Sequence, residues 1–152
     1  MKSINAWLSE YGESHQNPMN KRVHFICVPL IFFSIVGLLY NIKLTYAFEI
    51  EITLAHLMLV GVAIYYFFLS VPIAIGMILY SAFCLMLCYI IEESTKHLFI
   101  VSILLFVLAW IAQFYGHNIE GKKPSFLKDM QFLLIGPAWI MSFLLKKTGF
   151  TL

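Results

Sequence analysis

Charged residues are scarce in this chain of 152 residues, since Asp, Glu, Lys and Arg together make up 12% of it. Soluble globular domains contain about 25% charged residues, and half of that share cannot cover a surface that faces water. Hydrophobic residues reach 61%, and the net charge of +2 is too small for a groove that follows nucleic-acid phosphates. These shortages exclude a soluble enzyme, a disordered chain and a nucleic-acid-binding protein. They indicate that lipid is the solvent of most of the chain.

Cysteine is also scarce. The three cysteines, Cys27, Cys84 and Cys88, lie inside apolar runs and form no CxxC pair. An odd number without such a pair argues against a disulfide framework or a zinc ribbon. We therefore expect each cysteine to be a small buried hydrophobe.

Four apolar runs approach the length of about 20 residues that a membrane-spanning helix needs. They lie at approximately residues 23–40, 52–69, 71–91 and 98–115. A fifth run, 132–145, is shorter and contains Gly136-Pro137, which is typical of a re-entrant or interfacial helix. The sequence thus predicts a single all-α membrane domain over residues 1–152 with four transmembrane helices.

The N-terminal segment has the pattern of an amphipathic helix. Ser3 can cap it, and Ile4, Trp7, Leu8 and Tyr11 recur at helical spacing. Trp and Tyr favour the headgroup region of a bilayer. We expect a helix that lies on the membrane surface and ends at Gly12.

Basic residues are distributed unevenly over the polar segments that join these runs. The second and fourth segments hold only Lys43 and Lys96. The first, third and fifth hold Lys2, Lys21, Arg22, Lys122, Lys123 and Lys128. Because basic residues favour the cytoplasmic side, we expect a multi-pass protein with a cytoplasmic N-terminus, in a bacterial inner membrane or in the endoplasmic reticulum. Residues 1–22 and 116–131 then lie on the same membrane face.

That face holds three of the five histidines, and two of them flank the start of a predicted helix. Asn17 followed by Pro18 is typical of a helix cap and first turn. His15 then lies in the preceding loop, while Asn20 and His24 share one helical face.

The third histidine of this face, His117, lies three residues before Glu120. The two share a face if the fourth apolar helix continues. Imidazoles with a carboxylate and open positions are typical of non-heme iron sites, although zinc accepts the same ligands. We predict that His15, His24 and His117 bind one metal ion, with Glu120, Asn20 and Gln113 as hydrogen-bonding partners or as a further ligand.

Other interpretations of these side chains stay open. Histidines at a membrane surface often cap helices or form hydrogen bonds, and Glu120 can be a solvated loop charge. His56, at membrane depth, must face protein or a cavity, and it can be a metal ligand or a hydrogen-bonding residue. His97, beside Glu93 and Lys96, is interpreted as a solvated loop residue.

Two blocks of sequence carry a resemblance to a known family. The first reads Tyr11, His15, Asn17-Pro18, Asn20, His24 and Pro29. The second reads Trp110, Gln113-Phe114, Gly116-His117, Glu120 and Pro124, and is followed by Gly136-Pro137. In this order the chain resembles the small membrane proteins related to the fungal 2-hydroxy fatty acid dioxygenase. Asn118-Ile119 stands where these proteins tend to carry bulkier or aromatic residues, which alters the shape of the pocket.

The resemblance implies an iron(II)-dependent dioxygenase of fatty acid α-oxidation. Such an enzyme uses O2 to convert a 2-hydroxy fatty acid into an acid one carbon shorter, here at the cytoplasmic membrane face, and needs no 2-oxoglutarate. His15, His24 and His117 are then the Fe(2+) ligands, and Glu120 is a fourth catalytic residue. We expect Tyr11, Asn17, Asn20, Gln113 and Lys122 to support these ligands or to bind substrate.

Three other classes of function compete with this one. A non-catalytic lipid-binding or scaffold protein would use the N-terminal helix and basic loops as membrane anchors, and would bind no metal. A small transporter usually carries an intramembrane carboxylate, but the four long runs contain no Asp or Glu. A desaturase-type di-iron enzyme needs more histidines than the three on this face.

Overall fold

The computed structural model describes residues 3–47, 50–121 and 132–149. Within them the chain forms six helices and one two-stranded antiparallel hairpin. In chain order the elements are α1 (Ile4–Glu13), α2 (Pro18–Tyr40), β1 (Lys43–Ala47), β2 (Ile50–Thr53), α3 (Leu54–Leu69), α4 (Val71–Thr95), α5 (Leu98–Glu120) and α7 (Ile135–Lys147). This helical architecture confirms the predicted all-α class, to which the structure adds the hairpin.

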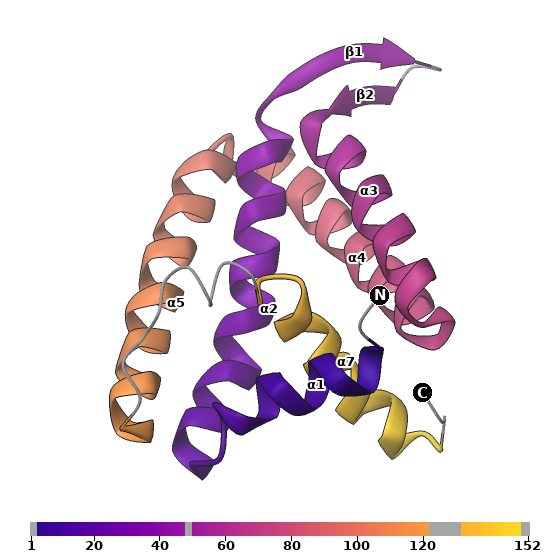
Figure 1. The fold of residues 1–152 in the computed structure, drawn as a ribbon. Coiled ribbons are helices and arrows are strands. Elements are labelled where there is room, and N and C mark those ends of the chain that lie inside the picture. Colours follow the sequence, from indigo (N-terminus) through magenta and orange to yellow (C-terminus); the bar gives the residue numbers. More distant parts are fainter. Residues whose placement is uncertain (1–2, 48–49, 122–131, 150–152) are drawn as a thin grey trace.

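α2 is the central helix of the bundle (Figure 1). α5 packs along it, while α3 and α4 pair with each other on its other side. α1 and α7 cross the bundle at the end that holds the first turns of α2 and the last turns of α5, which we call the histidine end. β1 and β2 project from the opposite end, which we call the hairpin end.

Three of the helices, α2, α4 and α5, are long and apolar enough to cross a membrane. Their mean hydropathies are 2.3, 2.3 and 2.4. α3 has 16 residues. Such a helix is about 24 Å long, less than the hydrocarbon thickness of about 30 Å. Among the described residues, three helices thus reach the length of a span, and the predicted count of four is not confirmed.

The second predicted run is shortened because its first residues belong to the hairpin. Ile52 pairs with Thr45, and Thr53 pairs with Lys43. β-Branched side chains favour strands, and an apolar run alone does not distinguish a strand from the start of a helix. Thr53 then caps α3, which begins at Leu54.

The predicted starts of the first two helices are confirmed. The Ser3 hydroxyl accepts a hydrogen bond from the Ala6 N–H at 3.3 Å. The Asn17 side chain accepts one from the Met19 N–H at 2.8 Å, and Pro18 is the first residue of α2. These caps satisfy backbone donors that a helix leaves free at its start.

α1 turns its apolar residues toward the protein. Ile4, Leu8 and Tyr11 are buried, and the helix packs against α7. The Trp7 ring contacts Phe132 edge to face, with centroids 6.2 Å apart. α1 continues through Gly12 to Glu13. The predicted amphipathic helix therefore exists, but its apolar face is covered by protein rather than lying open for lipid.

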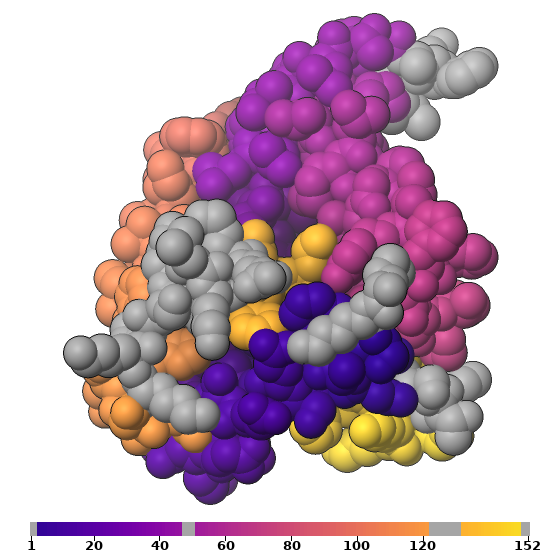
Figure 2. Space-filling model, viewed as in Figure 1, coloured from indigo at the N-terminus to yellow at the C-terminus, as the bar shows by residue number. Residues whose placement is uncertain are grey.

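The short C-terminal run forms α7, which has 13 residues and is too short to span a bilayer. Residues 135–140 are buried, and the helix packs on α1 and α4. In the space-filling view, residues just before α7 occupy the angle between α2 and α3 (Figure 2). α7 is therefore part of the packed core at the histidine end.

Two glycines allow α2 and α5 to approach closely at both ends of their contact. A Cβ atom on Gly37 would overlap the Ser102 hydroxyl. A Cβ atom on Gly116 would lie 2.5 Å from Oδ1 of Asn20. Close packing of α5 on the first turns of α2 is what brings the end of α5 to the predicted site.

Candidate metal centre

Three histidines that lie far apart in the sequence meet at the histidine end. His15 is in the loop between α1 and α2, His24 is in the second turn of α2, and His117 is in the last turn of α5. Their exposed fractions are 2%, 1% and 6%. One ligand nitrogen from each ring lies within 4.8 Å of the other two. The structure thus brings together all three residues that the sequence predicts as metal ligands.

Backbone carbonyls fix the orientation of two of these rings. Nδ1 of His15 lies 2.6 Å from the Tyr11 carbonyl oxygen. Nδ1 of His24 lies 3.0 Å from the Asn20 carbonyl oxygen. A carbonyl oxygen can only accept, so Nδ1 carries the proton in each case and Nε2 keeps its lone pair. This arrangement is common in histidines that bind metal through Nε2.

The three imidazoles fit a divalent metal ion. Metal–nitrogen bonds are about 2.0–2.1 Å for zinc, so two nitrogens on one ion lie no more than about 4 Å apart. Small ring rotations bring atoms within 4.8 Å to that separation. Three neutral nitrogen donors leave positions open for other ligands, which suits iron or zinc. The site therefore has the donors of a catalytic metal centre.

Glu120 connects the end of α5 to the loop that carries His15. Its carboxylate accepts hydrogen bonds from the backbone N–H of Gln16 at 2.8 Å and of Asn17 at 2.9 Å. The Asn20 side-chain amide donates to the same carboxylate at 3.0 Å. A carboxylate is favoured there because the start of α2 presents unpaired N–H groups and a positive dipole. Among the described residues, the group of possible ligand atoms comes from the three histidines. Glu120 is not part of that group, and its role is to hold the loop that carries His15.

The Asn20–Gly116 contact helps to position His117. Asn20 is fully buried, and its Oδ1 occupies the space that a side chain at position 116 would need. Because Gly116 precedes His117, this contact sets how closely the end of α5 approaches α2. The presence of glycine directly before His117 in the second sequence block is therefore explained by the space that Asn20 needs.

Aromatic side chains from α1 and α7 cover the histidines. The Tyr11 ring stacks on His15 with centroids 4.2 Å apart. Trp139 lies 5.4 Å from Tyr11 and 5.6 Å from His15, centroid to centroid. Sequence reasoning missed Trp139, although it follows closely on the Gly136-Pro137 pair. A Cβ on Gly136 would lie 3.0 Å from the Tyr11 hydroxyl, so this glycine permits the close approach of α7.

The other predicted site residues differ in their placement. Gln113 is buried one turn before His117 and lines a cavity together with His24 and Tyr11. Asn17 acts as the cap of α2. Lys122 lies outside the described residues, as do the other residues from 122 to 131.

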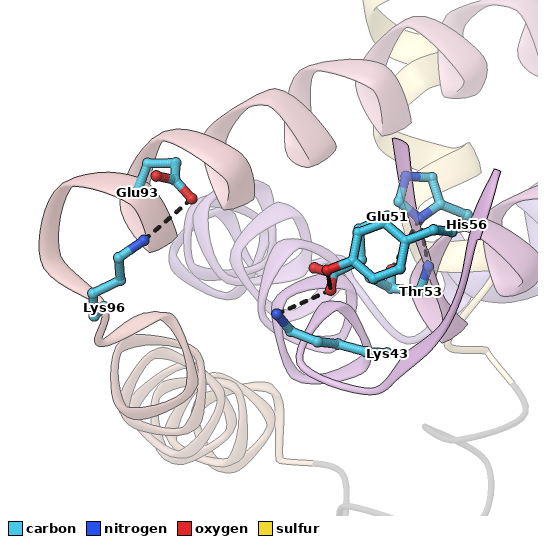
Figure 3. A network of polar contacts seen from close by, with 7 residues as sticks. Lys43, Glu51, Thr53, His56, Glu93 and Lys96 are labelled. Atoms are coloured by element: carbon cyan, nitrogen blue, oxygen red, sulfur yellow. Dashed lines mark hydrogen bonds and ion pairs between the residues drawn. The ribbon is translucent and has the colours of Figure 1, made fainter. Parts of the chain in front are cut away.

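Polar residues at the hairpin end bond to one another (Figure 3). His56 lies in the first turn of α3 rather than in the middle of a span, and its Nδ1 accepts from the Thr53 N–H at 3.1 Å, which is the hydrogen-bonding role of the two left open for it. Lys43 forms an ion pair with Glu51 at 3.0 Å, and the Tyr46 hydroxyl donates to the same carboxylate at 2.9 Å. These two hydrogen bonds lower the pKa of Glu51 below its usual range.

The α4–α5 turn adds a second ion pair at this end. Nζ of Lys96 lies 3.2 Å from a carboxylate oxygen of Glu93 (Figure 3). His97, the next residue, is exposed as expected. His56 and His97 are therefore separated from the histidine cluster by the length of the bundle (Figure 1).

The fold and the site define an α-helical protein with membrane-length apolar helices and a buried three-histidine cluster suited to metal. Residues 1–148 match the family model described as "2-hydroxy-palmitic acid dioxygenase Mpo1-like", and the chain belongs to this family. It is similar to the 2-hydroxy-palmitic acid dioxygenase MPO1 of Saccharomyces cerevisiae. The identity is 30% over 149 residues, which cover 97% of this chain and 82% of the yeast protein. No solved structure matches the chain.

Proposed function

We propose that this protein is an iron(II)-dependent dioxygenase that converts a 2-hydroxy fatty acid into an acid one carbon shorter. The observation that carries the proposal is the buried convergence of His15, His24 and His117 in a chain of this family. The name of the yeast relative, a 2-hydroxy-palmitic acid dioxygenase, supports the substrate class. An apolar cavity that begins at His24 supports a lipid substrate.

The three histidines would hold the iron ion through one nitrogen each. When bound, iron(II) supplies redox chemistry toward O2 and open positions that suit the chelating carboxylate and hydroxyl of a 2-hydroxy acid. The protein keeps protons on Nδ1 of His15 and His24 through the carbonyls of Tyr11 and Asn20. Glu120 positions the His15 loop through its hydrogen bonds to Gln16 and Asn17.

Two further side chains would bind and orient the substrate. Tyr11 and Gln113 line the cavity beside His24, and both offer hydrogen bonds to a carboxylate or hydroxyl. Tyr11 and Trp139 also cover His15 and exclude water from it. The reaction balances with one O2 as oxidant, because the substrate and O2 yield the shortened acid, carbon dioxide and water.

We also propose that the histidine end faces the cytoplasm. Lys21 and Arg22, in the first turns of α2, lie at this end, and the excess of basic residues in the odd-numbered polar segments of the sequence supports that orientation. Glu13 and Lys96 are exposed at opposite ends of the bundle. In a variant without native cysteines, Glu13→Cys should react with a membrane-impermeant thiol reagent only when the reagent has access to the cytoplasmic side. Lys96→Cys should react when the reagent is added to the opposite side. The reverse pattern would contradict the orientation.

The activity is tested with purified, iron(II)-loaded protein and 2-hydroxypalmitate in air. Mass spectrometry should detect pentadecanoate, and the product should disappear under anaerobic conditions or after chelation of iron. Folded, iron-loaded protein that yields no shortened acid from any 2-hydroxy fatty acid would contradict the proposal. A non-catalytic lipid-binding or scaffold role would then be the better account.

A further inference from the structure

An apolar cavity extends from the histidine cluster into the bundle. It lies between α2, α3, α5 and residues 132–136. Its polar lining residues, Tyr11, His24 and Gln113, belong to the histidine end. Ile35, in the last two turns of α2, and Met58, in the second turn of α3, line it toward the hairpin end. The cavity therefore has one polar end and one apolar end.

One face of α2 forms the long wall of this cavity. His24, Val28, Ile31 and Ile35 line it at spacings of four, three and four residues, which places them along one side of a helix. The eleven residue steps from His24 to Ile35 correspond to about 16 Å along the helix axis. This wall is long enough for an extended hydrocarbon chain and is continuous with the histidine site.

The opposite wall is tied to the bundle by a hydrogen bond. The Tyr66 hydroxyl of α3 donates to the carbonyl of Leu134, one of the lining residues. Tyr66 is fully buried. Leu134 and the lining residues beside it are thereby held against α3, and Figure 2 shows this part of the chain between α2 and α3.

We propose that this cavity binds the single hydrocarbon chain of a fatty acid, and that Ile35 and Met58 set the longest chain accepted. The orientation, with the carboxyl end at the histidines, rests on the proposed function. A single-chain acid is favoured over a two-chain phospholipid because the lining offers one apolar path that starts at one polar end. Each methylene buried in it should strengthen binding about fourfold, until the chain reaches Ile35 and Met58.

The first test requires no catalysis. The full-length protein in detergent is irradiated with a palmitic acid analogue that carries a diazirine near its methyl end, and the labelled residues are mapped by mass spectrometry. Label should fall at or beside Ile35 and Met58, and excess palmitate should compete it away. Label confined to outward-facing residues, such as Val60, would overturn the inference.

The second test uses neighbouring residues of α3. Met58→Trp should narrow the apolar end, whereas Leu57→Trp adds the same side chain at a position that is 63% exposed. For a series of 2-hydroxy acids of increasing length, Met58→Trp should lower turnover of the longest accepted substrate about tenfold relative to one two carbons shorter. Leu57→Trp should leave that ratio unchanged. An unchanged ratio in folded Met58→Trp protein would overturn the proposal.

The two tests separate this inference from the proposed activity. If the protein turns over no 2-hydroxy acid but the diazirine label maps to Ile35 and Met58, the cavity assignment stands and the catalytic proposal fails. Loss of that label in Met58→Trp, with retention in Leu57→Trp, supports the same conclusion. Turnover with label only on outward-facing residues overturns the cavity assignment and leaves the activity intact.

Discussion

The two ends of the bundle contain similar residue types but differ in how these are held. At the hairpin end, His56 bonds to Thr53, and Lys43 forms an ion pair with Glu51. At the histidine end, the imidazoles of His24 and His117 are buried and approach one another with centroids 4.9 Å apart. Glu51 at the hairpin end thus bonds to the side chains of Lys43 and Tyr46, whereas Glu120 at the histidine end accepts two backbone N–H groups in addition to the Asn20 side-chain amide.

Burial and fixed ring orientation, rather than the mere presence of histidine and glutamate, are the reason for proposing the metal site at the histidine end. An imidazole whose Nδ1 is held by a carbonyl has a defined lone pair on Nε2. His15 and His24 meet this condition. His56 instead accepts through Nδ1, and His97 is exposed. The comparison between the two ends can be tested by substituting the same type of residue at each end of the bundle.

The largest difference is expected for a histidine of each end. His24→Ala should lower turnover of a 2-hydroxy fatty acid more than about 100-fold, because losing a group that merely supports a metal ligand already costs about 10–100-fold. His97→Ala, at the hairpin end, should leave turnover unchanged. Equal activities of the two folded variants would contradict the assignment of the site.

The next difference concerns the two glycines between α2 and α5. Gly116→Ala and Gly37→Ala each place a methyl group against a buried neighbour, and each should lower the free energy of unfolding by about 1–3 kcal/mol. Gly116→Ala alone should also weaken metal binding, because its neighbour Asn20 bonds to Glu120. Thermal unfolding and metal titration measure the two effects.

Gly61→Ala is the control for this pair. No atom lies within 4 Å of a Cβ at this helical position among the described residues. Alanine should therefore be tolerated and raise stability by up to about 1 kcal/mol through its helix propensity. Metal affinity of Gly116→Ala equal to that of Gly37→Ala would show that the Asn20 contact does not position the site.

A smaller difference is expected for one glutamate of each end. Glu120→Gln removes the charge that braces Gln16 and Asn17, and it should weaken metal binding about tenfold. Glu51→Gln breaks an exposed ion pair and should leave metal binding unchanged. Metal titration of both purified variants tests this. A wild-type affinity in Glu120→Gln would mean that the loop holds His15 without the carboxylate.

The smallest effect is the pH dependence of the hairpin. Hydrogen bonds from Lys43 and Tyr46 lower the pKa of Glu51 from its usual 4.5. A group with a lowered folded-state pKa stabilises the fold above its unfolded-state pKa and loses that effect as pH falls through the folded-state value. The Tm difference between wild type and Glu51→Gln should thus be present at neutral pH and vanish in acid below pH 4.5. A difference that persists in acid would contradict the assignment.

Much of the site follows from local sequence signals. The Asn17-Pro18 pair indicates where α2 begins, and Asn20 and His24, four residues apart within that helix, lie on one face. The chain passes along the bundle four times from His24 to His117, through α2, α3, α4 and α5, and an even number of passes returns it to the same end. This holds although α3 is shorter than predicted. Capping and run length are local properties, so they can be interpreted without the fold.

The features that sequence reasoning missed depend on contacts between distant segments. Trp139 covers His15 only because α7 packs beside α1. The bonds from Gln16 and Asn17 to Glu120 join positions about a hundred residues apart, and no local pattern encodes them. The sequence did not reveal the hairpin because Ile52 lies just before the apolar residues of α3. Such a continuous apolar run looks like the start of a membrane helix.

The metal content of the purified protein tests the central claim most directly. Elemental analysis of protein isolated in detergent should find one iron ion per chain. The count should fall to the background level in a variant with His15, His24 and His117 all replaced by alanine, and should stay at one in His97→Ala. A folded wild-type protein that neither carries nor takes up iron, or a triple variant that retains it, would contradict the account.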